Sequence, residues 1–315
     1  MDKGAMQVGN MIAFMQYAIQ IIMAFLMISM VSVMLPRASV AAQRIAEVLE
    51  TDFAIKDPQQ AQHFGAGSKG YIEFKNVSFR YPGAEEDVLC DISFSARPGQ
   101  TTAFIGSTGS GKTTLINLIP RLYDVSEGNI LIDGMDIRNV TQHELREKIG
   151  YVPQKGVLFS GTIESNLSYG VKEASEDELK KAAQIAQAMG FIEEKPEGFK
   201  APISQGGTNV SGGQKQRLSI ARALTKRPEI FIFDDSFSAL DFKTDALLRK
   251  ALKGETENST VLIVAQRIGT IMNAEQIIVL DEGKIAGIGT HKELMQNCEV
   301  YRQIALSQLS REELA

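Results

Sequence analysis

The sequence predicts an α/β domain with a largely parallel sheet, an antiparallel β layer beside it, and one membrane-spanning helix before it. Three observations predict this fold class: a long uncharged run near the N-terminus, apolar strand patterns that alternate with helical patterns, and a glycine-rich loop between a strand and a helix. Strands that alternate with helices are typical of a parallel sheet covered by helices.

Length and charge bound the functional classes. A chain of 315 residues is long enough for one large domain or two ordinary ones. Its 33 Lys and Arg residues against 38 Asp and Glu residues give a formal charge of −5, which argues against a nucleic-acid partner. Cys90 and Cys298 lie far apart without metal-type spacing. They fit a reducing compartment, and we expect no disulfide between them.

The stretch from Met11 to Leu35 contains no charged residue and ends at Pro36 and Arg37. Crossing the hydrocarbon core of a bilayer takes about 20 apolar residues. A secretory signal peptide has a shorter apolar region and a cleavage site of small residues. A buried helix of a soluble core fits an uncharged run of this length less well. We therefore expect one transmembrane helix.

The basic residues around this helix predict its orientation. Arg37 and Arg44 follow the apolar run closely, whereas only Lys3 precedes it. Because cytoplasmic flanks carry an excess of Lys and Arg, this weak bias directs the C-terminal part to the cytoplasm. The expected location is the cell membrane, with the globular part on its cytoplasmic side.

Composition divides the chain into four segments and one insertion. Residues 1–50 hold the membrane helix and its cytoplasmic extension, and residues 51–69 have the Pro, Gly and Gln content of a linker. A globular domain follows over 70–306, with a helical insertion at about 160–226. Residues 307–315 form a polar tail that we expect to fray.

Strand patterns in the domain are of two kinds. Polar and apolar residues alternate in YIEFKNVSFRY and VLCDISFSA, as in strands of an antiparallel layer. Short apolar runs occupy QTTAFIG, EIFIFD, STVLIVA and EQIIVLD, and helical patterns occupy QKQRLSIARAL and KTDALLRKAL. The second group indicates a largely parallel sheet with connecting helices.

A glycine-rich segment, GSTGSGKT, follows one of these strands and opens a helix. Its glycines let successive backbone N–H groups surround phosphates, Lys112 neutralises charge, and the Thr113 hydroxyl can bind Mg²⁺. A mere glycine turn is not favoured, because the strand, loop and helix occur in the required order. We expect this loop to bind Mg²⁺ and the phosphates of a nucleotide through Gly106, Ser107, Thr108, Gly109, Ser110, Gly111, Lys112 and Thr113.

Two adjacent carboxylates, Asp234 and Asp235, end the apolar run IFIF. In nucleoside triphosphatases with such a loop, an acid at the end of a neighbouring apolar strand holds the magnesium ion. An apolar strand that ends in Asp is uninformative by itself. Coupled to the phosphate loop upstream, it predicts Asp234 as a metal ligand.

Four further motifs are VSGGQ, FRYPG, YVPQ and SALD. With them the sequence resembles an ATP-binding cassette (ABC) exporter of the multidrug type over essentially its whole length. The resemblance implies that residues 1–50 are the last membrane helix of a half-transporter subunit. We therefore expect the chain to be the C-terminal part of a longer, multi-pass subunit. Multidrug or lipid-like cargo is implied only at the level of the family.

The resemblance also implies ATP and Mg²⁺ as cofactors and assigns roles to single residues. It adds Thr114 to the loop residues that bind the phosphates of ATP. Tyr81 stacks on adenine, where the strand pattern alone would favour packing, and Gln154 binds magnesium and contacts the membrane part. In this family the signature motif serves the nucleotide of a second subunit, so that two cassettes sandwich two ATP molecules. The signature residues are Val210, Ser211, Gly212, Gly213 and Gln214, and the loop expected to contact the second cassette is Ser238, Ala239, Leu240 and Asp241.

Two positions depart from the family pattern. The general base that polarises the attacking water is normally Glu, and here it is Asp235, which is one methylene shorter. A base must lie within roughly 2.6 to 3.2 Å of the water it activates. The family usually places a switch His after the next strand, and here Gln266 occupies that place. An amide can donate a hydrogen bond, but it cannot become cationic.

Together these departures resemble the degenerate half of a heterodimeric exporter. We hypothesise that the chain's own site binds ATP and hydrolyses it slowly, while its signature completes the competent site of a partner half-transporter. One alternative is a homodimeric exporter in which Asp235 works as the base, and another is a regulatory subunit without turnover. A soluble cassette of DNA repair or translation is disfavoured by the membrane helix and the acidic balance.

Overall fold

The computed structural model describes residues 7–65 and 67–308. Lys3, used above for orientation, and residues 309–315 of the expected tail lie outside the described residues. The chain divides into two compact units, Met1–Lys56 and Asp57–Ala315, and each is described by itself.

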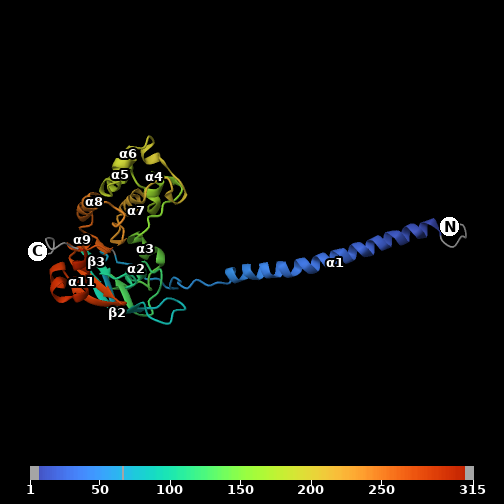
Figure 1. Ribbon diagram of the computed structural model, residues 1–315, viewed down its shortest axis with the longest axis horizontal. Helices are drawn as coiled ribbons and strands as arrows, with labels where there is room; N and C mark the ends of the chain where they lie inside the picture. Colours follow the sequence, from blue (N-terminus) through green and yellow to red (C-terminus); the bar gives the residue numbers. More distant parts are fainter. Residues whose placement is uncertain (1–6, 66, 309–315) are drawn as a thin grey trace. The chain divides into compact units, whose positions relative to one another are not determined.

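The first unit is a single helix, α1 (Val8–Leu49), of 42 residues. It joins the expected membrane span to its helical extension and continues through Pro36 (Figure 1). Its most apolar window has a mean hydropathy of 2.4, and none of that window is buried. Among the described residues, α1 is the one helix whose length and composition suit a membrane crossing.

The predicted linker divides at Asp57, because the residues from there onward belong to the globular unit. The backbone and side-chain amides of Gln142 donate to Asp57 Oδ1 at 2.8 and 3.1 Å. The backbone bond contributes most to lowering the pKa of Asp57, and the side-chain bond adds to the effect. The backbone N–H of Phe64 donates to Glu144 Oε1 at 2.9 Å. We call residues 57–71 the strap.

Asp133 holds the C-terminal end of the strap. Its Oδ2 accepts from the N–H groups of Lys69 and Gly70 at 3.2 and 3.0 Å, and its Oδ1 accepts from Tyr71 N–H at 3.0 Å. The Ser68 hydroxyl donates to the same carboxylate. Burial opposes ionisation here, yet these bonds outweigh it and hold the pKa of Asp133 below its ordinary value. The strap is therefore anchored on the globular unit.

The main sheet of the globular unit has six strands in the order β12-β11-β3-β10-β9-β6. Neighbouring strands are parallel except β12, which is antiparallel to β11, so the predicted largely parallel sheet is confirmed. The carboxyl ends of β3, β10, β9 and β6 consequently meet at one edge, where ligands bind in such sheets. The strands are β3 (Thr101–Gly106), β6 (Ile149–Val152), β9 (Ile230–Asp234), β10 (Thr260–Val264), β11 (Gln276–Asp281) and β12 (Lys284–Gly289).

A second sheet, in the order β2-β1-β4-β5, is antiparallel throughout and confirms the predicted antiparallel layer. In this sheet Phe74 lies between Phe94 and Ile130 in register. The rings of Phe74 and Phe94 stack with centroids 4.5 Å apart, which stabilises the β1/β2 pair. The strands are β1 (Ile72–Phe79), β2 (Leu89–Ala96), β4 (Glu127–Ile132) and β5 (Met135–Asp136).

Two helices of the helical insertion, α5 and α7, begin with side-chain caps. The Ser175 and Ser211 hydroxyls each accept a bond from the backbone N–H three residues later and form capping boxes at the starts of α5 and α7. Figure 1 shows α4, α5 and α6 grouped at one end of the globular unit, away from β2 and α11. The elements are β7 (Gly161–Thr162), α4 (Ile163–Leu167), η1 (Ser168–Gly170), α5 (Glu176–Ile185), α6 (Met189–Glu193), η2 (Gly198–Lys200), β8 (Pro202–Ile203), η3 (Gln205–Gly207) and α7 (Gly212–Lys226).

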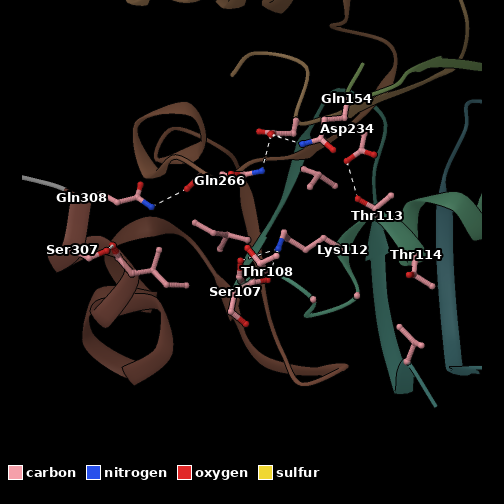
Figure 2. Close-up of a pocket in the computed structure, with 18 residues that line it drawn as sticks. Ser107, Thr108, Lys112, Thr113, Thr114, Gln154, Asp234, Gln266, Ser307 and Gln308 are labelled. Carbon is pink, nitrogen blue, oxygen red and sulfur yellow. Dashed lines mark hydrogen bonds between the residues drawn. The ribbon is translucent and has the colours of Figure 1, made fainter. Parts of the chain in front are cut away.

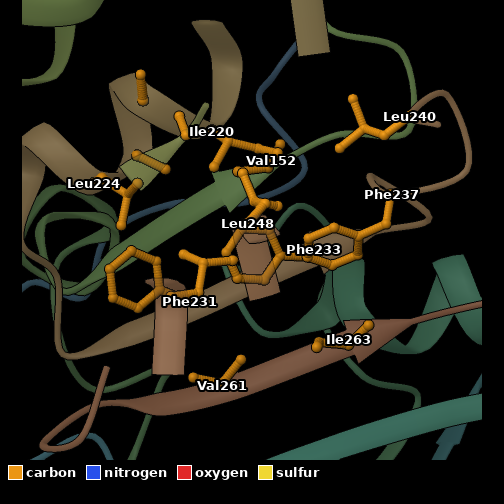
Figure 3. Packing of buried hydrophobic residues seen from close by; sticks show 14 of the residues in the cluster. Val152, Ile220, Leu224, Phe231, Phe233, Phe237, Leu240, Leu248, Val261 and Ile263 are labelled. Carbon is orange, nitrogen blue, oxygen red and sulfur yellow. The ribbon is translucent and has the colours of Figure 1, made fainter. Parts of the chain in front are cut away.

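A hydrophobic cluster joins the main sheet to the insertion. Figure 3 shows Phe231 and Phe233 of β9 between Ile220 and Leu224 of α7 and Val261 of β10. Every residue of β9 is buried, so this core fixes the strand that carries the two carboxylates. The remaining helices of the globular unit are α2 (Lys112–Leu118), α3 (Gln142–Glu147), α8 (Phe242–Glu255), α9 (Ile268–Ile271), α10 (His291–Asn297) and α11 (Glu299–Gln308).

The C-terminal helix extends further than its composition predicts. Ser307 and Gln308, which we assigned to the polar tail, form the last turn of α11. Tyr301 of α11 is fully buried, and its hydroxyl lies 2.8 Å from His291 Nδ1. Burial raises the pKa of Tyr301 to about 12. These contacts anchor α11 on the unit that contains the main sheet.

Candidate nucleotide-binding site

The glycine-rich loop connects β3 to α2, as its sequence predicts. Gly109 and Gly111 adopt positive φ angles of 86° and 95°, which L side chains rarely adopt. A Cβ on Gly111 would approach Leu89 Cδ2 to 2.7 Å, whereas one on Gly109 would meet no atom within 4 Å. The loop is therefore packed on one side and opens onto free space on the other, which fits a backbone cradle for phosphates.

Lys112 lies inside this cradle. Its Nζ donates to the carbonyl oxygens of Gly106 and Ser107 at 2.8 and 2.7 Å and to Ser110 Oγ at 3.3 Å. Burial lowers the pKa of Lys112, and the carboxylates of Asp235 and Asp234 offset part of that lowering. The ammonium group is thus held next to the loop backbone, where it can neutralise an anionic ligand.

Asp234 ends β9 and faces the start of α2. The Thr113 hydroxyl donates to Asp234 Oδ1 at 3.2 Å. Only 4% of Asp234 is exposed. Burial raises the pKa of Asp234, and the neighbouring charge of Asp235 adds to that rise. A buried carboxylate beside a hydroxyl is a donor pair that suits Mg²⁺.

The described residues contain no group of three or more His, Cys, Asp and Glu side chains that could bind a metal without other ligands. Mg²⁺ usually takes one or two protein oxygens and completes its shell with water and substrate phosphates. Thr113 and Asp234 therefore fit an ion held jointly with a nucleotide. Gln154 follows β6 at the same sheet edge and lines the same cavity as Thr113 and Asp234.

Asp235 accepts two hydrogen bonds from amides. Gln154 Nε2 donates to Asp235 Oδ2 at 3.2 Å, and Gln266 Nε2 donates to the same oxygen at 2.8 Å (Figure 2). The backbone of Asp235 adopts a φ of 45°, and its N–H donates to Val264 O at 2.9 Å. The side chains of Gln154 and Gln266 therefore meet at one carboxylate oxygen of Asp235. These three residues, which we expect to act in catalysis, follow three different strands of the main sheet.

These side chains line a cavity of about 520 Å³, drawn in Figure 2. The cavity brings together most of the residues predicted from the sequence: Gly106, Ser107, Thr108, Gly109, Gly111, Lys112, Thr113, Thr114, Gln154, Asp234, Asp235 and Gln266. Ser110, also a residue of the loop, is buried and does not line the cavity. The sequence did not predict six further lining residues, which belong to no phosphate-binding motif: Val88, Ile105, Val264, Ile304, Ser307 and Gln308.

Tyr81 lies beside the cavity and does not line it. Its hydroxyl lies 3.0 Å from Thr114 Oγ1, so it contacts the loop helix directly. Its ring packs edge-on against Phe79 and Tyr123, with centroids 4.9 and 5.2 Å away. The adenine-stacking role of Tyr81 stays a prediction, and the observed ring packing is the alternative that the strand pattern favoured.

The signature motif lies outside the cavity. Ser211 caps α7 by accepting from Gln214 N–H at 3.3 Å, and Gly212 is exposed at the start of that helix. Gly213 approaches the SALD loop, because a Cβ there would lie 3.3 Å from Ala239 O. In that loop Leu240 is buried, and Asp241 caps α8. The signature and the SALD loop are thus neighbours at a surface separate from the chain's own phosphate loop.

The fold and the site define one class of protein. A phosphate loop after β3 and a carboxylate after β9, at one edge of a mostly parallel sheet, constitute the P-loop nucleotide-binding fold. Residues 89–238 match the family described as ABC transporter. The globular unit therefore has the fold of an ABC cassette, which is the ATP-binding domain of ABC transporters.

Similar proteins support this assignment. An ABC transporter ATP-binding protein of Mycobacterium tuberculosis is 48% identical over 310 residues, which are 98% of this chain and 53% of the relative. An ATP-dependent lipid A-core flippase of Desulfotalea psychrophila is 40% identical over 93% of this chain and 51% of its own length. The chain spans about half the length of the curated relatives it matches.

A solved structure of a bacterial Atm1-family ABC exporter with ATP bound has the same fold. It superposes with a TM-score of 0.83 at 33% sequence identity, and the match covers 99% of this chain and 55% of that one. The predicted cassette fold is therefore confirmed, and the solved structure that shares it is that of an exporter.

Proposed function

We propose that this chain is the ATP-binding subunit of a membrane exporter and couples ATP binding and hydrolysis to the export of a substrate. The observation that carries this proposal is the convergence of the phosphate loop, Asp234, Gln154 and Gln266 at one edge of the main sheet. Bound Mg²⁺ would neutralise phosphate charge there. α1 has the length and apolarity of a membrane segment, which supports a membrane location for the subunit with its cassette in the cytoplasm.

We further propose that the chain's own site hydrolyses ATP slowly. Asp235 is shorter by one methylene than the glutamate usual in the family, and its Oδ2 already accepts bonds from Gln154 and Gln266. An aspartate held in this way is poorly placed to reach a water at the γ-phosphate. Gln266 stays neutral, so it adds a hydrogen bond without adding positive charge.

The position of the signature supports a two-chain assembly. Residues 210–214 lie outside the cavity formed by the chain's own phosphate loop. Ser211 and Gly212 are exposed at the start of α7, a 15-residue helix whose N-terminus favours phosphate. We propose that this surface completes the ATP site of a different half-transporter, which supplies the glutamate and histidine that this chain lacks.

The test is Mg²⁺-dependent ATP turnover by the full chain in detergent, compared with the double variant Asp235→Glu with Gln266→His. We expect the native chain to bind ATP but turn over little, and the double variant to gain about 10²-fold or more. A matched control is Asp177→Glu with Gln184→His, since both residues are exposed on α5. Equal turnover of the native chain and the double variant would contradict the slow site.

One observation favours a second candidate, a homodimeric exporter in which Asp235 is the working base. Both amide bonds of Asp235 end at Oδ2, which leaves Oδ1 for a water. In that case the native chain hydrolyses ATP in the presence of Mg²⁺, and Asp235→Asn abolishes the activity. If the chain is a regulatory subunit, both the native chain and the Asp235→Glu with Gln266→His variant should bind ATP without hydrolysing it.

A further inference from the structure

The C-terminal helix closes one side of the nucleotide site. Ile304, Ser307 and Gln308 of α11 line the same cavity as Gln266 (Figure 2). We propose that Gln308 is a positioning residue that fixes residues 266–271, here called the switch segment, and thereby keeps the Gln266 side chain on Asp235. The kinetic part of this proposal rests on the proposed function, whereas its structural part does not.

Gln308 uses both ends of its amide on the switch segment. Its Nε2 donates to the Gln266 carbonyl oxygen at 2.8 Å, the bond drawn in Figure 2. Its Oε1 accepts from the N–H of Ile268 at 2.9 Å. Ile268 begins α9, and the preceding N-cap residue Arg267 makes no side-chain cap bond. Gln308 therefore satisfies a helix-terminal N–H and fixes the backbone on both sides of Arg267.

The helix that presents Gln308 is itself fixed. Tyr301 and Ala305 of α11 are fully buried in the main hydrophobic cluster, and Ile304 packs against that cluster. The Tyr301 hydroxyl lies 2.8 Å from His291 Nδ1. Because α11 is anchored one and two turns before its end, Gln308 holds the switch segment against a rigid element.

The contacts form a continuous connection from α11 to the hydrolytic carboxylate. Gln308 holds the Gln266 backbone, and the Gln266 side chain donates to Asp235 Oδ2 at 2.8 Å. Without the first contact, the Gln266 backbone gains freedom and its amide spends less time on Asp235. An amide of this length has a donor and an acceptor for the two backbone groups, whereas alanine has neither.

Hydrogen exchange measured by mass spectrometry on the full chain without nucleotide tests the structural part. Gln308→Ala should accelerate exchange across the switch segment by about 5-fold, the equivalent of one lost hydrogen bond. Gln303→Ala is the matched control, since Gln303 lies on the same helix and donates to Glu299. Gln308→Glu keeps the acceptor for Ile268 and should leave exchange at that N–H near the native rate. Unchanged exchange in Gln308→Ala would overturn the proposal.

Kinetics test the connection to Asp235. In the Asp235→Glu background, we expect Gln308→Ala to lower kcat for ATP about 5-fold and to leave KM within about 2-fold. When Gln266→Ala is added to that background, Gln308→Ala should have no further effect. An equal loss of kcat in both backgrounds would mean that Gln308 does not act through Gln266. A chain without any turnover would contradict the proposed function instead, and hydrogen exchange would still decide the role of Gln308.

Discussion

The two halves of the nucleotide site are built differently. The binding half consists of loop backbone at 106–111, the Lys112 ammonium and the Thr113–Asp234 pair, all close to the buried ends of β3 and β9. The hydrolytic half consists of Gln154, Asp235 and Gln266, which meet through two amide bonds to one carboxylate oxygen. The binding half depends on backbone conformation as well as on side chains, whereas the hydrolytic half depends on side chains alone.

Because the two halves are built differently, ATP binding and ATP hydrolysis can change independently of one another. The positive φ angles of Gly109 and Gly111 leave little freedom for substitution in the binding half. In the hydrolytic half, Asp235→Glu adds one methylene and Gln266→His adds an imidazole ring. Either substitution should change the hydrolytic chemistry and leave the phosphate-binding loop intact. Variants that change only one of the two halves therefore test whether ATP binding and ATP hydrolysis are separable.

The largest expected effect is in the binding half. Lys112→Ala removes a partly buried cation, so we expect ATP affinity to fall about 10²-fold, in the range of a lost charge-assisted hydrogen bond. Gln266→Ala should change affinity by less than about 3-fold, because it belongs to the hydrolytic half. Titration of both variants with ATP by calorimetry measures the contrast. Equal losses in the two variants would mean that the halves are not separable.

A smaller effect is expected from pH. Burial raises the pKa of Asp234, and the ionised carboxylate is the form that holds Mg²⁺. On acidification, Mg²⁺ affinity should therefore begin to fall at a higher pH than an ordinary aspartate would give. Affinity should drop about 10-fold for each pH unit below the raised pKa. Asp234→Asn should bind Mg²⁺-ATP weakly at every pH and lose this dependence. A native profile that is flat down to the ordinary range of aspartate would contradict the assignment.

The smallest effect is expected beside the cavity. The chain contains no tryptophan, so Tyr81→Trp introduces a single fluorophore without background. If residue 81 stacks on adenine, ATP should change its emission while affinity stays within about 3-fold, since both rings stack on any base. Tyr123→Trp, on the neighbouring ring, is the control. Equal changes at both positions would favour the observed ring packing of Tyr81 over stacking.

The sequence predicted the parts of the site that follow from local order along the chain. The phosphate loop and Asp234 each lie at the end of an apolar strand, and the parallel register then brings them together. The antiparallel layer and the helical insertion were also indicated by local patterns. Strands β4, β6 and β12 were not assigned, because their short apolar runs are interrupted by glycine or charge.

The parts that could not be predicted depend on contacts between residues far apart in the sequence. Gln308 is an ordinary amide near a polar C-terminus, and nothing in its neighbourhood indicates that it reaches Gln266. The strap has linker composition, yet Asp57, Phe64 and Gly70 are bound by residues more than sixty positions later. Such contacts are decided by the packing of the whole unit and not by local pattern.

The strap also shortens the unanchored part of the chain that follows α1. α1 ends at Leu49, and the first anchor of the strap is Asp57, so residues 50–56 form the tether between them. Fully extended, such a tether reaches at most about 25 Å. If the cassette were displaced by more than this length, the chain would pull directly on the end of α1. The bonds of Asp57 to Gln142 would then bear the load first and the Phe64–Glu144 bond next, so that force would enter the cassette at α3.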